Sequence, residues 1–206
     1  MTSRRMKSTV AFVVAISSVG ILDVAHATYY GRDAFFSGNG LPDAAIAALV
    51  YYEDSNVSNL GYSNITLSAR TEFDNVTDAV INFRRAASSE INSAKLRFFA
   101  VTGGTKDYYW FGKTFNYDIN GYELSESAAV TAAWSKVDLK LNDEKMNLFG
   151  FTQNQRTRIA VHELGHVLSM VHQPSGYSHQ SSVMQENQVE YWHLSPVDIA
   201  NLQYMY

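Results

Sequence analysis

The chain has 206 residues, with 16 basic and 20 acidic side chains, a formal net charge of −4 and no cysteine. This length fits one domain that can bury a substantial core. The acidic balance argues against a nucleic-acid partner, which calls for a basic face. The lack of cysteine excludes disulfides, thiol nucleophiles and thiolate metal ligands, so histidine and carboxylate remain as candidate ligands.

The N-terminus has the pattern of a secretory signal peptide. An apolar stretch at residues 9–22 is shorter than the roughly 18 residues that a spanning helix needs, and Ala25-His26-Ala27 is an A-x-A cleavage site. Its basic start contains Arg4, Arg5 and Lys7. We therefore expect residues 1–27 to be removed, leaving a secreted chain without a membrane span, and we expect it to be a monomer.

Hydrophobic periodicity and turn residues predict the elements in chain order. We expect a short helix, a polar loop, a strand and a second helix at residues 41–52, 53–64, 65–72 and 74–92. Three strands should follow at residues 95–102, 108–116 and 137–141.

Two further helices complete the predicted order, and a capping box opens each of them. The first, at residues 152–170, begins with Thr152 and Gln155, and the last begins with Ser195 and Asp198. This order predicts an α+β fold in which a twisted mixed β-sheet carries a backing helix, the helix at residues 152–170 and a C-terminal helix.

The most informative motif is His162-Glu163-Leu164-Gly165-His166, which is followed by His172. Residues four apart share one face of a helix, so His162 and His166 can direct their imidazoles at one point. Glu163 can then reach a water on the metal rather than the metal itself. If the chain turns back after the helix, His172 supplies a third nitrogen. Three protein ligands with an open fourth position are typical of a catalytic zinc site.

Other residues give alternatives for the ligand set. Glu186 or Glu190 could supply the third ligand, as in thermolysin-like enzymes, although the spacing favours His172. His179 and His193 are interpreted as polar residues of a loop or of the cleft rim, because isolated histidines are usually not ligands.

With these residues the chain resembles the metzincin clan of zinc endopeptidases, and most of all its matrixin-type members. The resemblance covers residues 65–206, including a Met-turn at Ser182-Val183-Met184 and a C-terminal helix. It implies a metzincin-like domain that hydrolyses proteins or peptides, in which His162, His166 and His172 bind zinc and Glu163 is the general base and acid. It also implies that Met184 forms an apolar floor beneath the histidines. Residues 28–64 are then either a short pro-segment or the N-terminal part of the domain.

Three features depart from the family pattern. Ser169 stands where the family has a glycine that ends the helix in a left-handed turn, and a non-glycine residue there costs about 1–2 kcal/mol. No tyrosine closely follows Met184, and the nearest candidate is Tyr191. The family's usual latency, in which a prodomain cysteine binds the zinc, is excluded because the chain has no cysteine.

Some motifs and functions stay open. Asp118, Asn120 and Glu123 flank Gly121 in a fragment of a calcium-binding pattern that is more often a plain turn. In a eukaryotic secretory pathway, N-x-S/T sequons would matter at Asn56, Asn64 and Asn75. Besides the leading interpretation as a secreted zinc endopeptidase, the sequence allows an inactive metzincin-like binding protein or a zinc amidase with a non-peptide substrate.

Overall fold

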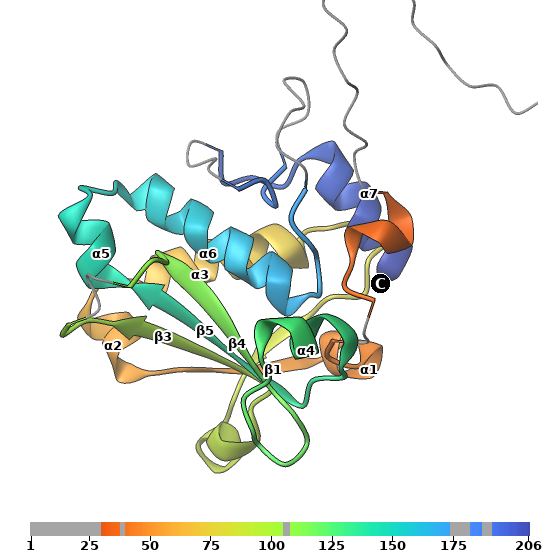
Figure 1. Cartoon of the computed structure of the whole chain (residues 1–206), viewed down its shortest axis with the longest axis horizontal. Helices are drawn as coiled ribbons and strands as arrows, with labels where there is room; N and C mark the ends of the chain where they lie inside the picture. Colours follow the sequence, from red (N-terminus) through yellow and green to blue (C-terminus); the bar gives the residue numbers. More distant parts are fainter. Residues whose placement is uncertain (1–29, 38–39, 105–107, 174–181, 187–190) are drawn as a thin grey trace, which may run out of the picture.

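A computed structural model describes residues 30–37, 40–104, 108–173, 182–186 and 191–206, so the predicted signal peptide lies outside the described residues. The fold is α+β, as expected: helices pack on a five-stranded mixed sheet (Figure 1). In chain order, the elements are η1 Gly31–Ala34, α1 Asp43–Ile46, β1 Leu49–Glu53, α2 Ser55–Asn59, α3 Ser63–Asp74, β2 Phe83–Arg85, η2 Ser88–Ser93, β3 Leu96–Val101, β4 Gly112–Tyr117, α4 Glu126–Thr131, β5 Lys136–Asn142, α5 Asp143–Leu148, α6 Gln153–Val167 and α7 Pro196–Met205.

The strands lie in the order β2-β1-β3-β5-β4. All neighbours pair in parallel except β4, which runs antiparallel to β5 at one edge, with Thr114 opposite Leu139. Side chains alternate between the faces of a strand, and in β3 Leu96, Phe98 and Ala100 are buried while their neighbours are half-buried. The buried row belongs to the hydrophobic core, to which α6 also contributes.

Helix α6 crosses the face of the sheet and packs on β4 and β5, with α3 beside it (Figure 1). Its predicted capping box is present: the Thr152 hydroxyl accepts a hydrogen bond from the Gln155 N–H, and the Gln155 side chain accepts one from the Thr152 N–H. The same arrangement of Ser195 and Asp198 opens α7. The predictions of β3, β5, α6 and α7 are therefore confirmed, although α6 ends at Val167 rather than at residue 170.

Two predictions near the N-terminal end of the described chain are wrong. The helix expected at residues 41–52 is confined to the single turn α1, and the second half of that range is strand β1. The loop expected at residues 53–64 contains α2, whose first turn is capped by the Asp54 carboxylate accepting from the Asn56 N–H. Strand pairing on both sides of β1 outweighs any helical preference there, because each neighbour supplies backbone hydrogen bonds.

The next two predictions are also wrong. The strand expected at residues 65–72 is helix α3. The buried face of this helix includes two polar side chains, Thr66 and Arg70, which both hydrogen-bond Glu53 of β1, and an apolar pattern does not reveal such a face. The helix expected at residues 74–92 is replaced by β2 and the 3₁₀ helix η2. Asp78 has a φ of 65°, a left-handed conformation that interrupts a helix. The strand expected at residues 108–116 begins only at Gly112.

The N-terminal segment packs into the same fold as the rest of the chain. Strand β1 lies between β2 and β3, and residues 34–36 run alongside residues 169–171. In that contact, the N–H of Phe36 donates to the Ser169 carbonyl and the N–H of Val171 donates to the Ala34 carbonyl. Among the described residues, no helix has both the length and the apolar character that crossing a membrane requires.

Candidate metal centre

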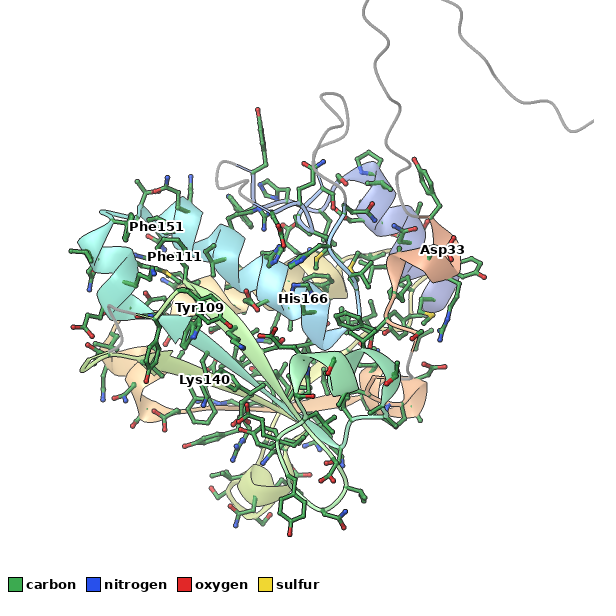
Figure 2. All side chains as sticks on the ribbon, viewed as in Figure 1. Asp33, Tyr109, Phe111, Lys140, Phe151 and His166 are labelled. Carbon is green, nitrogen blue, oxygen red and sulfur yellow. The ribbon has the colours of Figure 1, made fainter. Side chains whose placement is uncertain are left out.

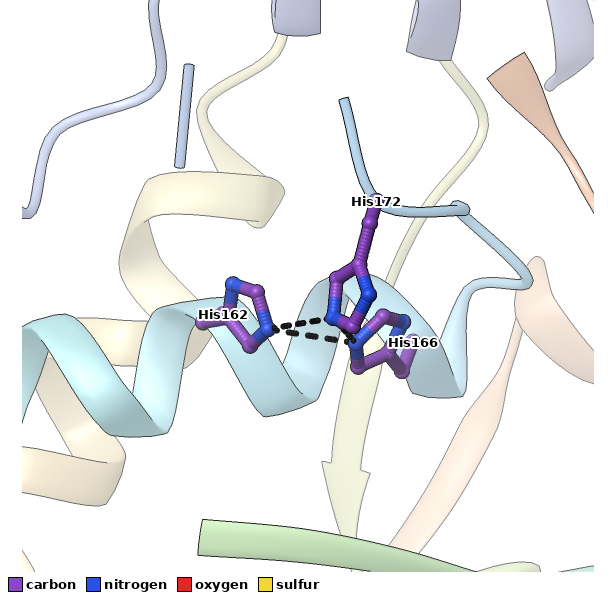
Figure 3. Close-up of side chains that lie close together, drawn as sticks. All are labelled: His162, His166 and His172. Atoms are coloured by element: carbon purple, nitrogen blue, oxygen red, sulfur yellow. Dashed lines mark hydrogen bonds between the residues drawn. The ribbon is translucent and has the colours of Figure 1, made fainter. Parts of the chain in front are cut away.

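Three histidines meet at the C-terminal half of α6. His162 and His166 lie one turn apart on this helix and are half-buried. The helix ends at Val167 with Leu168 as its C-cap, and Ser169 then takes a φ of 65°, the left-handed conformation in which glycine is usual. This turn reverses the chain and brings His172, which is more exposed, back over the helix (Figure 3).

The Nε2 atoms of the three rings converge on one point (Figure 3). The Nε2 of His162 lies 3.2 Å from that of His166 and 3.1 Å from that of His172, and the last two are 3.0 Å apart. Three nitrogens at tetrahedral angles and about 2.0–2.1 Å from one ion would be about 3.3 Å apart. The spacing of the rings is therefore close to that of ligands sharing one metal ion.

The hydrogen-bond partners of the three Nδ1 atoms determine which nitrogen of each ring carries the proton. The Nδ1 of His162 lies 2.7 Å from the Val183 carbonyl, and the Nδ1 of His166 lies 2.8 Å from the Met170 carbonyl. A carbonyl oxygen only accepts, so both Nδ1 atoms donate. His172 Nδ1 is 2.8 Å from a Glu186 carboxylate oxygen, which also accepts. In the neutral rings, all three Nε2 atoms then present lone pairs to one point, an arrangement that a cation stabilises.

The protonation equilibria of the histidines favour the same neutral forms. Burial is the main cause of a downward pKa shift in all three rings, bringing His162 well below its usual value and His166 to about 4. Glu186 works in the opposite direction on His172, because its carboxylate favours the protonated ring. Neutral imidazoles are the forms that bind metal.

Glu163 lies beside the histidines with its carboxyl group buried. Glu163 is 8% exposed, and burial raises the pKa of its carboxyl group to about 8. The positive charges of Arg158 and Lys113 oppose that shift. The carboxylate accepts a hydrogen bond from the Thr114 backbone of β4. A Cβ on Gly112 would lie only 2.7 Å from the Glu163 Cγ, so this glycine lets the edge strand approach the helix closely.

Met184 lies beneath the helix, fully buried. A Cβ added to Gly165 would lie 2.4 Å from the Met184 Sδ, so the sulfur sits directly against the helix between the two histidines. Buried Asp198 of α7 holds the segment that leads to Met184. Its carboxylate accepts from the Val183 N–H and the Ser182 hydroxyl, at 3.0 and 2.5 Å, and from the N–H and hydroxyl of Ser195.

A cavity of about 450 Å³ opens in front of the cluster, between α6, β4 and α4. Its wall includes Glu163, all three histidines and Gly112 to Thr114 of the edge strand. At the start of this strand, Phe111 stacks on Phe151, just before α6, with ring centroids 4.5 Å apart (Figure 2). This stacking ties the edge strand to the helix that carries the histidines.

The structure separates the remaining candidates from this centre. His193 pairs with Glu72 at 2.9 Å, and Tyr191 is 62% exposed. The Asp118 carboxylate accepts from the N–H groups of Asn120 and Tyr122 and so closes its own turn, and Asn120 and Glu123 lie in the same loop. Among the described residues, the three histidines are the group arranged to hold a metal ion. His179 and Glu190 lie outside the described residues.

Sequence reasoning missed one role and one buried charge near the centre. It considered Glu186 as a ligand, but its carboxylate contacts the Nδ1 of His172, on the side of the ring away from the convergence point. It did not consider Arg158, a buried residue of α6. Arg158 precedes His162 by four positions, and this helical spacing places it on the histidine face and could have revealed it.

Comparison with known proteins gives no family assignment. No family model matches the sequence, and no curated protein matches it.

Proposed function

We propose that the protein is a zinc-dependent endopeptidase with a metzincin-like, matrixin-type fold. The observation that carries the proposal is the convergence of three Nε2 lone pairs beside the buried carboxyl group of Glu163, at the wall of an open cavity. The left-handed turn at Ser169 and the sulfur of Met184 under the helix support the same proposal.

The donor set suits zinc. His162, His166 and His172 would hold the ion through Nε2, and their Nδ1 partners orient the rings. Three histidine nitrogens and an open fourth position are typical of catalytic zinc. When bound, zinc supplies a Lewis acid that activates water and polarises a carbonyl group.

The residues of the chain have two tasks in this proposal. In its ionised form Glu163 takes a proton from the attacking water, and it then passes that proton to the leaving amine. Burial in the cavity wall raises the pKa of its carboxyl group, which favours holding the proton between the two steps. The β4 edge borders the cavity through Gly112, Lys113 and Thr114. An extended peptide can lie along such a strand edge and present its carbonyl group to the centre. Secretion, a monomeric state and the loop around Gly121 as a calcium site stay predictions.

The test is hydrolysis of a mixed peptide library by the purified protein, with and without a zinc chelator, beside Glu163→Ala and His162→Ala. We expect chelator-sensitive cleavage by the native protein. Glu163→Ala should retain one equivalent of zinc by elemental analysis and lose about 10²–10⁴-fold in rate, because only the proton carrier is gone. His162→Ala should lose the metal as well.

His193→Ala is the matched control, because His193 pairs with Glu72 away from the centre. It should retain both zinc and cleavage. A native protein that binds one equivalent of zinc and cleaves no member of the library would contradict the peptidase function. That outcome would favour a binding protein or an amidase acting on a non-peptide substrate.

A further inference from the structure

Ser169 forms the turn that leads to His172, and its backbone conformation is unfavourable for a serine. Its φ of 65° lies in the left-handed region, which residues other than glycine rarely adopt. The N–H of Ser169 still donates to the His166 carbonyl, which closes the end of α6. A serine persists in such a conformation only where the surrounding structure stabilises it.

The Ser169 hydroxyl forms a hydrogen bond with the phenol group of Tyr206. Ser169 is 3% exposed, so its hydroxyl needs a partner within the protein. It donates to the Tyr206 phenol oxygen, and the phenol in turn donates to the Leu168 carbonyl at 2.8 Å. Burial raises the pKa of the phenol, which therefore stays neutral and able to donate. One tyrosine thus satisfies both the side chain of the turn and a carbonyl group at the end of α6.

Tyr206 is itself held by contacts outside the turn. Its N–H donates to the Leu202 carbonyl of α7, and its own carbonyl accepts from the Val80 N–H at 2.9 Å. Its ring packs edge-on against Phe35, with ring centroids 6.1 Å apart. Helix α7, which leads to Tyr206, also packs against η1 (Figure 1). The phenol oxygen is therefore a fixed acceptor for the Ser169 hydroxyl.

Gly40 leaves the space that this hydroxyl occupies. A Cβ on Gly40 would lie 1.8 Å from the Ser169 Oγ and 3.1 Å from the Ser169 Cβ. The Gly40 carbonyl accepts from the Trp134 N–H at 2.6 Å, which holds this residue against the turn. The hydroxyl is therefore enclosed between Gly40 and Tyr206, which come from opposite ends of the described chain.

The backbone of this turn positions two of the three histidines. The Met170 carbonyl, directly after Ser169, accepts from the His166 Nδ1. Phe36, whose N–H donates to the Ser169 carbonyl, stacks on the His166 ring with centroids 6.1 Å apart. His172 follows the turn by three residues and reaches the other two rings only because the chain reverses there. A different backbone conformation at Ser169 would therefore displace both ligands.

We propose that Ser169 and Tyr206 are positioning residues whose hydrogen bond keeps the ligand-bearing turn formed in the metal-free protein, an inference that rests on the zinc site of the proposed function. The bond replaces the conformational freedom that a glycine would have at this position. Without it, the strained serine would populate other turns, and the apparent zinc affinity would fall with the fraction of protein in the competent one.

The experiment measures the zinc dissociation constant of the folded protein by competition with a chelator. Ser169→Ala keeps the Cβ and removes the donor, whereas Tyr206→Phe removes the acceptor together with the bond to Leu168. Each should weaken zinc binding about tenfold, and the double variant should be no weaker than Tyr206→Phe alone, because the two groups act as a unit. Ser169→Gly should restore the native affinity to within about threefold, because glycine adopts the turn without strain.

A purely structural role would give a different result. Ser169→Ala and Tyr206→Phe would then lower the free energy of unfolding in urea but leave the zinc affinity of the folded protein unchanged. Tyr62→Phe is the matched control, because the Tyr62 hydroxyl is also buried but donates to Asp143, away from the histidines. It should show this purely structural behaviour. Unchanged zinc affinity in Ser169→Ala would overturn the inference, and so would an equal loss in Ser169→Gly.

Amide hydrogen exchange in the presence of a chelator tests the turn without zinc. The N–H groups of Met170 and Val171 donate to backbone carbonyls and report whether the turn is closed. Ser169→Ala should speed their exchange about tenfold and leave that of Phe149, at the end of α5, unchanged. If the native protein binds no zinc, the proposed function fails, but these rates still decide the inference. Equal exchange in the native protein and in Ser169→Ala would refute it.

Discussion

Gly165 allows a sharp test of the packing beneath the metal centre. This residue lies inside α6, where alanine would ordinarily stabilise the helix by about 1 kcal/mol. Here an added Cβ would lie 2.4 Å from the Sδ and 3.2 Å from the Cε of Met184, and both residues are buried. Overpacking of this kind costs about 1–3 kcal/mol. Gly165→Ala should therefore lower the free energy of unfolding by up to about 2 kcal/mol.

A double-mutant cycle isolates this contact. Met184→Ala alone should cost about 2–5 kcal/mol, because it leaves a cavity under the helix. In that background the clash is gone, and Gly165→Ala should instead stabilise the protein by about 1 kcal/mol.

Urea unfolding of the four proteins, with a chelator present to remove metal, gives the coupling energy. We expect about 1–3 kcal/mol. If Gly165→Ala stabilises the protein equally in both backgrounds, Met184 does not pack against this helix, and the apolar floor under the histidines is wrong.

Two other predictions concern the residues that support the centre. Glu186→Ala should weaken zinc binding about 10–100-fold in a competition with a chelator, because the carboxylate orients His172; unchanged affinity would show that the contact has no such role. Asp198→Asn should lower the free energy of unfolding, measured in urea, by about 3 kcal/mol. The buried carboxylate accepts from the Ser182 hydroxyl and the Val183 N–H, and the NH₂ group of an asparagine cannot accept from such donors. A loss under about 1 kcal/mol would contradict that network.

The errors of the sequence analysis have a common physical origin. Alternating apolar residues at 65, 67 and 69 indicated a strand, but Leu67 is 54% exposed in α3. The helix buries Thr66 and Arg70 instead, and Glu53 makes their burial favourable. A hydrophobic pattern cannot reveal a polar residue whose partner lies more than ten positions away. The helix predicted from the apolar stripe at residues 74–92 was wrong for a similar reason. Strand β2 in this range depends on pairing with β1, which is distant in the sequence.

Predictions that depended on local interactions were confirmed. The capping boxes at Thr152 and Ser195 join residues three positions apart, so the sequence alone locates the starts of α6 and α7. Strands β3 and β5 are recognisable because continuous or alternating apolar residues fill a buried sheet.

The sequence by itself determined the neighbours on one helix: His162 and His166 share a face because helical geometry places residues four apart together. Only the tertiary structure decided what surrounds them. Val183 and Glu186 reach the Nδ1 atoms of His162 and His172 from loop positions 14–21 residues along the chain. Asp198 of α7 accepts its hydrogen bonds from Ser182, Val183 and Ser195, which lie in the Met184 segment and at the start of α7. Such contacts depend on how the chain folds back on itself, which local periodicity does not encode.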